Sequence, residues 1–290
     1  GYLSFRNSQK AVENLADQLM EEVGARVQDN LRTQLDNAHK INQLNADLID
    51  LEILPIDDQV TLGQHFLKQI NQFPDVLYIY FGNPQGGIIA AQHSSIAGEP
   101  TLGLTQDFVK NDYLVYNIDQ SGKPTTLKEN VGAFDSTVRP WYIAATEAEK
   151  SVWSDIYLDV VTDEPITTAA LPIYDQQDNL LGVLSADILL FEEFNKLLGS
   201  LKIRQSGEIF IIQRTGELLF SSLLETSEQP ERNSVSLPMA SDSPLPLIET
   251  AVQQAELTIS DFEMTKATQG FNFFLDEEKQ FAQMSPFQDA

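Results

Sequence analysis

The chain has 290 residues, which is long enough for two domains of ordinary size or for one large one. It carries 43 acidic and 18 basic residues, and the formal net charge of −25 argues against nucleic acid and against an anionic membrane surface as partners. Because the chain contains no cysteine, disulfides, thiolate nucleophiles and cysteine-ligated metal centres are excluded.

Residues 1–53 predict one long stalk helix. Apolar side chains recur every three or four positions from Val12 to Leu48, the positions between them are mostly polar, and no proline precedes Pro55. A helix of this length needs a partner that covers its apolar stripe. Two partners stay open, namely the helix's own domain and a second copy of the chain in a coiled coil.

Residues 54–200 predict a module of hairpins and a few helices. A second helix is expected over Asp57–Phe73, because Asp57 or Asp58 offers an N-cap and Pro74 follows its end. Strand patterns then come in pairs around turn residues, at 76–81 with 88–91, 113–118 with 124–128, and 166–174 with 180–188. A short helix is predicted to begin near Pro140, and a helix over 190–201 ends the module. Antiparallel hairpins with few helices indicate an α+β sheet.

Residues 201–290 predict a second, smaller module of the same kind. It has a hairpin at 208–213 and 217–221, a polar loop at 225–243, a helix at 245–254, and strands at 271–275 and 281–284. An antiparallel sheet that ends on a short terminal strand is an unusual natural stop, so we expect this module to be truncated at its C-terminus. The start at Gly1 likewise favours an excised fragment of a longer protein.

The segment from Phe134 to Tyr142 carries most of the chemistry. Arg139, Trp141 and Tyr142 bring a forked cation and two hydrogen-bonding aromatic side chains together where a loop enters a helix. Arginine presents paired planar donors that match a carboxylate, whereas tryptophan and tyrosine supply apolar walls with polar tips.

Further candidates follow downstream. Tyr157 and Asp159 close one extended segment, and Asp187 lies in the strand predicted at 180–188. An arginine for a carboxylate, a carboxylate for an ammonium group and aromatic walls are together what an α-amino acid pocket requires. Asp159 has an alternative interpretation as a simple turn residue.

A structural interpretation stays open beside the functional one. In that interpretation Arg139 pairs with Asp135 or Asp187, and Trp141 and Tyr142 belong to the core. Three tyrosines on the predicted strands are interpreted as sheet surface rather than pocket: Tyr80, Tyr113 and Tyr116.

At these residues the sequence resembles the double Cache (dCache) sensor domains of bacterial chemoreceptors, histidine kinases and nucleotide cyclases. The resemblance covers the whole chain, from the long N-terminal helix through a module with Arg-x-Trp-Tyr and a linker helix to a smaller module. It implies an α+β fold in which the long helix is followed by two PAS-like antiparallel-sheet modules. Residues 54–200 would be the membrane-distal, ligand-binding module, and residues 201–290 the membrane-proximal one.

The amino-acid-binding branch of the family has an aromatic residue, usually Tyr, then four residues, then Arg-x-Trp-Tyr, and later an Asp that closes a strand. By this resemblance Arg139 and Trp141 hold the ligand carboxylate, and Tyr142 and Asp187 hold its ammonium group. The auxiliary residues of the motif match Tyr157 and Asp159. Phe134 departs from the pattern, because one hydroxyl is missing there, and a lost neutral hydrogen bond costs roughly 0.5–1.5 kcal/mol.

The resemblance implies an extracytoplasmic (periplasmic) ligand-sensing domain of an inner-membrane receptor, with an amino acid as the small-molecule ligand. The fragment itself is not expected to be an enzyme, while a kinase or cyclase domain stays open for the full-length parent. The parent is expected to form a homodimer through the N-terminal helix and to meet the membrane only through segments outside this fragment. Three alternatives stay open: a sensor of small amines, purines or carboxylates, an interaction module without a ligand, and a periplasmic hydrolase that uses Asp187 and Asp159.

The sequence offers no motif for a cofactor, a metal or a catalytic centre. His39, His65 and His93 are scattered and have no zinc-ligand spacing, and neither a Gly-x-Ser-x-Gly elbow nor a phosphate-binding glycine loop with lysine occurs. We therefore expect no cofactor and no catalytic residue, and of metals only a single calcium site stays open.

Overall fold

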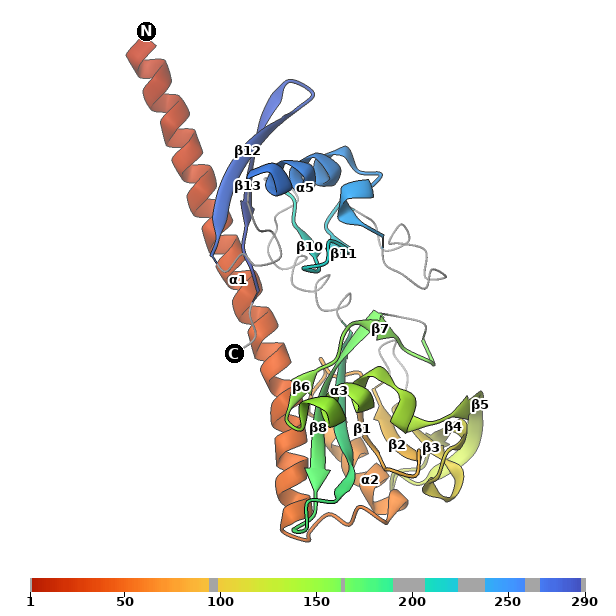
Figure 1. The fold of residues 1–290 in the computed structure, drawn as a ribbon. Coiled ribbons are helices and arrows are strands. Elements are labelled where there is room, and N and C mark those ends of the chain that lie inside the picture. The colour runs from red at the N-terminus through yellow and green to blue at the C-terminus, as the bar shows by residue number, and fades with distance from the viewer. Residues whose placement is uncertain are drawn as a thin grey trace. The chain divides into compact units, whose positions relative to one another are not determined.

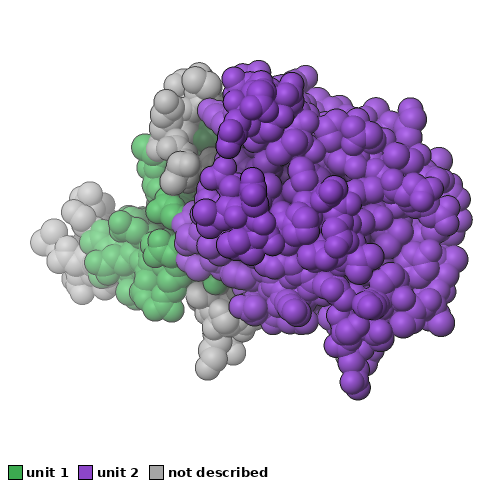
Figure 2. Space-filling model, turned by 90° about the horizontal axis from the view of Figure 1, so that it is seen from below, with its two compact units in different colours: residues 1–32, 194–290 green, residues 33–193 purple. Residues whose placement is uncertain are grey.

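The computed structural model describes residues 2–93, 99–162, 165–189, 207–223, 238–258 and 267–287. The chain divides into two compact units, which Figure 2 colours separately: residues 33–193, and residues 1–32 with 194–290. The helix predicted at 190–201 and most of the polar loop predicted at 225–243 lie outside the described residues.

The predicted long helix is confirmed as α1, Tyr2–Asp50. In the unit of residues 33–193, its side chains Ala38 and Ile41 are fully buried against that unit's own core, so this part of the stripe is covered by its own domain. Helix α2, Gln59–Ile70, begins at Asp58, whose carboxylate accepts hydrogen bonds from the backbone N–H groups of Val60 and Thr61, both at 3.1 Å. Asp58 is therefore the N-cap, and satisfies donors that the first helical turn leaves without partners.

One antiparallel sheet of nine strands forms the centre of this unit, in the order β5-β4-β3-β2-β1-β9-β8-β6, with β7 also paired to β8. The strands are β1 (Tyr78–Gly82), β2 (Ile88–Gln92), β3 (Thr101–Thr105), β4 (Asn111–Ile118), β5 (Pro124–Phe134), β6 (Val152–Trp153), β7 (Tyr157–Leu158), β8 (Pro165–Tyr174) and β9 (Leu180–Leu189). The three predicted hairpins and the predicted α+β class are confirmed. Strands β3, β6 and β7 were not predicted, and β5 continues six residues past its predicted end to Phe134.

The sheet is covered on both faces, as Figure 1 shows. Ile79 and Phe81 of β1 pack into a core with helices α1 and α2. Tyr78 and Tyr80, which alternate with them, belong to a second core that includes Trp141 and other residues of helix α3, Pro140–Ala148. Because successive side chains of a strand point to opposite faces, β1 contributes to both cores.

The other unit has the smaller elements of the predicted second module. Strands β10 (Phe210–Ile212) and β11 (Leu218–Ser221) form one hairpin, and β12 (Gln269–Leu275) and β13 (Glu278–Met284) form another. Helix α5, Pro246–Thr258, packs Ile248 and Val252 into a small core with Leu218. Both predicted hairpins and the predicted helix are confirmed.

Candidate ligand-binding site

The unit of residues 33–193 contains a pocket with an empty volume of about 350 Å³, which includes space open to solvent. Six of the seven candidate residues line it: Phe134, Arg139, Trp141, Tyr157, Asp159 and Asp187. The other lining residues are Tyr78, Tyr80, Ile88, Ala90, Tyr113, Val160 and Val161. Tyr142 is placed elsewhere, in the apolar cluster next to Trp141, with ring centroids 5.4 Å apart and no hydrogen-bond partner for its hydroxyl among the described residues.

The guanidinium group of Arg139 lies between two aromatic rings. Arg139 precedes Pro140 at the start of α3 and has an extended backbone. Its Cζ lies 5.9 Å from the ring centroid of Phe134 and 5.6 Å from that of Tyr157. Within the described ranges the guanidinium group makes no hydrogen bond or ion pair, and the ammonium group of Lys110, not Arg139, lies beside Asp135 at 4.0 Å. Among the described residues Arg139 therefore forms no ion pair with Asp135 or Asp187, whereas Trp141 and Tyr142 do belong to a buried cluster, as the structural interpretation expects.

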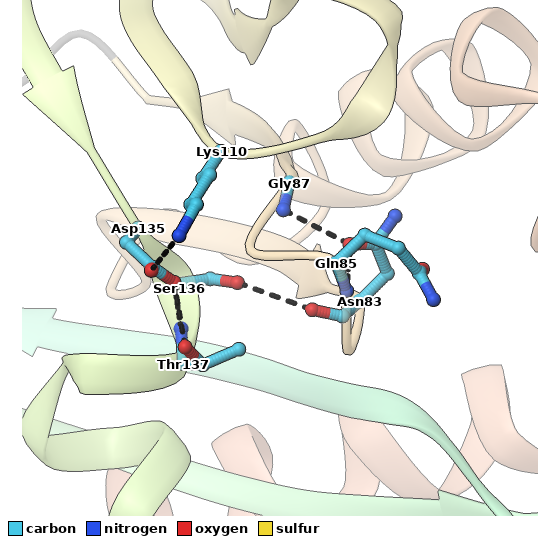
Figure 3. A network of polar contacts seen from close by, with 7 residues as sticks. All are labelled: Asn83, Gln85, Gly87, Lys110, Asp135, Ser136 and Thr137. Carbon is cyan, nitrogen blue, oxygen red and sulfur yellow. Dashed lines mark hydrogen bonds and ion pairs between the residues drawn. The ribbon is translucent and has the colours of Figure 1, made fainter.

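The loop between β1 and β2 is closed by Asn83, as Figure 3 shows. Its side-chain oxygen accepts hydrogen bonds from the backbone N–H groups of Gln85 at 3.1 Å and Gly87 at 2.9 Å. Its side-chain nitrogen donates to the carbonyl oxygen of Phe108 at 2.7 Å. One amide side chain thus fixes this loop and the segment before β4.

The segment that leads into Arg139 rests on this loop. Ser136, which is fully buried, donates its N–H to the carbonyl oxygen of Gly86 at 3.0 Å. Its hydroxyl donates to the carbonyl oxygen of Asn83 at 3.3 Å (Figure 3). Arg139 then donates its own backbone N–H to the carbonyl oxygen of Ser136 at 3.1 Å. These bonds hold the backbone of Arg139 in place before any ligand is present.

Replacing Gly86 by alanine is expected to loosen this junction. Gly86 has φ +81°, and an added Cβ would lie 2.6 Å from Oδ1 of Asp135, so the substitution adds a clash to the backbone strain. We expect Gly86→Ala to lower the free energy of unfolding by about 2–4 kcal/mol in urea titrations. Gly132→Ala is the matched control, because Gly132 has φ +98° with nothing within 4 Å, and we expect it to lose only about 1–2 kcal/mol. Equal losses would show that the contact with Asp135 contributes nothing.

Asp187 is buried at the floor of the pocket, with 3% of its surface exposed. Its Oδ1 accepts hydrogen bonds from the hydroxyl groups of Tyr80 at 2.9 Å and Thr168 at 2.6 Å, while Oδ2 accepts none from the part of the chain that is described. Burial raises the pKa of Asp187 to about 8, and the negative charge of Asp159 makes a smaller upward contribution. The two hydrogen bonds and the positive charge of Arg139 lower the pKa and offset part of this rise. The carboxyl group is thus mostly protonated at pH 7 when the pocket is empty.

Asp159 both lines the pocket and closes a turn. Its Oδ2 accepts hydrogen bonds from the backbone N–H groups of Val161 at 3.2 Å and Thr162 at 2.8 Å, and from the Thr162 hydroxyl at 2.9 Å. Tyr78 donates its hydroxyl to the same oxygen at 3.1 Å. The two interpretations of Asp159, as pocket residue and as turn residue, therefore both apply.

Sequence reasoning missed three pocket tyrosines. Tyr78 was not considered, and the interpretation of Tyr80 and Tyr113 as sheet surface is wrong, because all three are buried and line the pocket. The register pairs Tyr78 with Asp187 across β1 and β9, so both point to the same face of the sheet. Burial raises the pKa of Tyr80 well above its usual value, so this hydroxyl stays protonated and can donate a hydrogen bond to Asp187.

The described residues show no sign of a metal centre or a membrane span. No three His, Asp or Glu side chains among them lie close enough to hold a metal ion. No helix in the described ranges is both long enough and apolar enough to pass through a bilayer.

A family model described as "Cache domain" matches residues 8–289, which is nearly the whole chain. The chain belongs to the dCache family. Cache domains of chemoreceptors and sensor kinases are extracytoplasmic. The recognised resemblance is thereby confirmed.

Curated relatives of this Cache domain include two chemotaxis receptors and a kinase. The methyl-accepting chemotaxis protein McpC of Bacillus subtilis is 37% identical over 87 residues, which cover 30% of this chain and 13% of McpC. PctB of Pseudomonas aeruginosa is 25% identical over 162 residues, covering 52% of this chain and 24% of PctB. Sporulation kinase D of B. subtilis is 31% identical over 104 residues, covering 36% of this chain and 19% of the kinase. The Cache domain thus spans less than a quarter of the length of each of these relatives.

Solved structures share the fold of this Cache domain. The sensory domain of the Campylobacter jejuni chemoreceptor Tlp3 with isoleucine bound has a TM-score of 0.53 at 18% identity, covering 94% of this chain and 87% of that one. The ligand-binding domain of Mlp24 with asparagine has a TM-score of 0.50 at 18% identity, covering 94% and 87%. Methyl-accepting chemotaxis protein X has a TM-score of 0.60 at 15% identity, covering 96% and 94%. At these identities the similarity shows the fold.

Proposed function

We propose that this Cache domain is the extracytoplasmic, non-enzymatic sensor of an inner-membrane receptor and that its pocket binds an α-amino acid. One observation carries the proposal: an unpaired guanidinium group, Arg139, and a buried carboxyl group with an unused oxygen, Asp187, line the same pocket. An α-amino acid is a zwitterion, so its carboxylate can pair with the guanidinium group and its ammonium group can pair with the carboxylate. The Tlp3 and Mlp24 domains, which share this fold, were solved with isoleucine and with asparagine, and this supports the ligand class.

Each half of the zwitterion has its own set of partners in this proposal. The ligand carboxylate binds the paired donors of Arg139 and the indole N–H of Trp141, which makes no hydrogen bond to any described residue. The ammonium group binds Oδ2 of Asp187, while Tyr80 and Thr168 hold Oδ1 and fix the orientation of the carboxylate. Tyr142 has no direct role here and supports Trp141 from behind.

The two modules predicted from the sequence receive separate roles in this proposal. The module of residues 54–200 is the membrane-distal one and binds the ligand, and the module of residues 201–290 is the membrane-proximal one. The N-terminal helix joins two receptor copies, and Leu15 and Leu19, which are 64% and 43% exposed, supply apolar side chains for that contact. Ligand binding then acts by its different affinity for two arrangements of the receptor.

A thermal-shift screen against the free L-amino acids, small amines, purines and carboxylates tests the ligand class. We expect a set of free amino acids to raise the melting temperature, because saturation at about 100 times Kd adds roughly 2.7 kcal/mol. The N-acetyl and α-amide derivatives of the same amino acids are the matched controls, because each lacks one charge of the zwitterion. A response to amines, purines or simple carboxylates alone, or an equal response to the derivatives, would contradict the proposal.

A further inference from the structure

The strand register places a small residue two strands away from the proposed ammonium site. Tyr80 of β1 pairs with Ala90 of β2, and Ala90 pairs with Gly103 of β3. Neighbouring strands lie about 4.8 Å apart, so Ala90 lies two strands, or about 10 Å, from the strand that holds Asp187. The small side chain of Ala90 lines the pocket and leaves room above it, where a larger side chain would fill that space.

Tyr113 closes the far side of this space. A Cβ added to Gly103 would overlap the hydroxyl end of Tyr113, so the tyrosine side chain lies directly over the glycine. The ring of Tyr113 lies 5.2 Å from that of Phe134 between centroids, and Ile88 of β2 completes the wall. Phe134, which stands where the family pattern has tyrosine, thus adds an apolar surface to this wall.

The described residues that line this side of the pocket, Ile88, Ala90, Tyr113 and Phe134, carry no charge. Among the described lining residues the charges are those of Arg139, Asp159 and Asp187. Tyr78 pairs with Asp187 in the sheet, and its hydroxyl donates a hydrogen bond to Asp159. Asp159 therefore lies toward the same end of the pocket floor as Asp187. An acidic ligand side chain would meet no cation among the described lining residues beside Ala90, and a basic side chain would lose its water against apolar walls.

We infer that the ligand is an amino acid with an aliphatic side chain, which lies on Ala90 between Ile88, Tyr113 and Phe134. This inference rests on the proposed function, because it assigns the α-carboxylate and the α-ammonium group to Arg139 and Asp187. Each methylene buried on this wall is expected to tighten binding roughly fourfold.

Titration calorimetry with the 290-residue chain tests the inference with matched ligands. The matched ligands have side chains of similar shape and different polarity. Leucine is compared with asparagine and aspartate, and valine is compared with threonine. We expect leucine and valine to bind at least about tenfold more tightly than their polar counterparts. If asparagine, aspartate or lysine binds as tightly as leucine, the inference is wrong while the proposed function survives. If no α-amino acid binds, the proposed function itself is wrong.

Two variants test whether this wall causes the preference for an aliphatic side chain. Ala90→Leu fills the space, so leucine should lose its advantage over alanine as a ligand, and alanine should still bind. Ile88→Ala removes part of the wall and decides the question where Ala90→Leu fails to fold. In Ile88→Ala the ratio of leucine to alanine affinity should fall at least about fourfold. An unchanged ratio in a folded variant would overturn the assignment of the side-chain site.

Discussion

Replacing Arg139 by alanine should weaken the binding of an α-amino acid by about 30-fold to 5,000-fold, while the fold keeps its stability. The loss corresponds to about 2–5 kcal/mol for a carboxylate that is left unpaired in a desolvated site. Stability should change little, because the guanidinium group has no ion-pair or hydrogen-bond partner among the described residues and makes no capping bond to helix α3. Titration calorimetry measures the first quantity, and urea unfolding measures the second.

Two further variants separate charge from geometry at this position. Arg139→Lys keeps the charge and loses the planar pair of donors, so it should recover only part of the affinity. Lys128→Ala removes a positive charge from an exposed position of strand β5, and it should leave affinity unchanged. Wild-type affinity in Arg139→Ala, or a large loss of stability in that variant, would remove this residue from the proposed site.

Replacing Asp187 by asparagine should stabilise the empty protein at neutral pH and weaken ligand binding at least about 30-fold. The pKa of this carboxyl is about 8 in the folded chain, against about 3.9 for an unfolded aspartate. Between these values the folded state holds a proton that the unfolded state has released, so stability falls as the pH rises from about 4 to about 8. The amide does not titrate, and at pH 7 the variant should gain about 1–4 kcal/mol. Urea unfolding of both proteins at pH 5, 7 and 9 measures the difference, and an equal pH slope would contradict the expectation.

Ligand binding should release a proton for the same reason. The ammonium group pairs with the ionised carboxylate, so below pH 8 the Asp187 carboxyl must lose its proton on binding, and affinity should rise up to about tenfold per pH unit. Calorimetry at pH 6.5 in two buffers with different ionisation enthalpies should show nearly one proton released per ligand. The absence of proton release at that pH would show that Asp187 is already ionised or does not meet the ammonium group.

The local elements could largely be predicted from the sequence, and the order of the sheet could not. The spacing of apolar residues in α1 and the cap at Asp58 are local signals, and both predictions are confirmed. Strand β3 was missed because Gly103 interrupts its short apolar pattern. The end of β5 was missed because residues 128–133 are mostly polar or glycine, and the β4–β5 ladder contains register shifts. Without β3 and the full length of β5, the burial of Tyr113 beside Phe134 could not be predicted.

The residue types suggested the site, but the directions of the side chains depend on the three-dimensional packing and could not be predicted. Trp141 and Tyr142 are neighbours on α3, and consecutive residues of a helix point about 100° apart, so the two side chains cannot face the same pocket equally. Whether Arg139 meets Asp135 or Asp187 depends on where a distant strand runs, and this is set by the β1–β9 pairing. The burial of Tyr80 could not be predicted for the same reason, because only the strand pairing shows that β1 is a central strand of the sheet.

The alternation along the central strands also bears on how such a receptor domain changes its ligand during evolution. On β1 and β2, side chains at even-numbered positions such as Tyr80 and Ala90 belong to the pocket side, and odd-numbered ones such as Ile79 and Ile89 belong to the core shared with helices α1 and α2. A single exchange at an even position can therefore alter chemical preference while the odd positions continue to support the domain. Insertion of one residue would reverse both sets at once, so selection can proceed by point substitution here and not by changes in strand length.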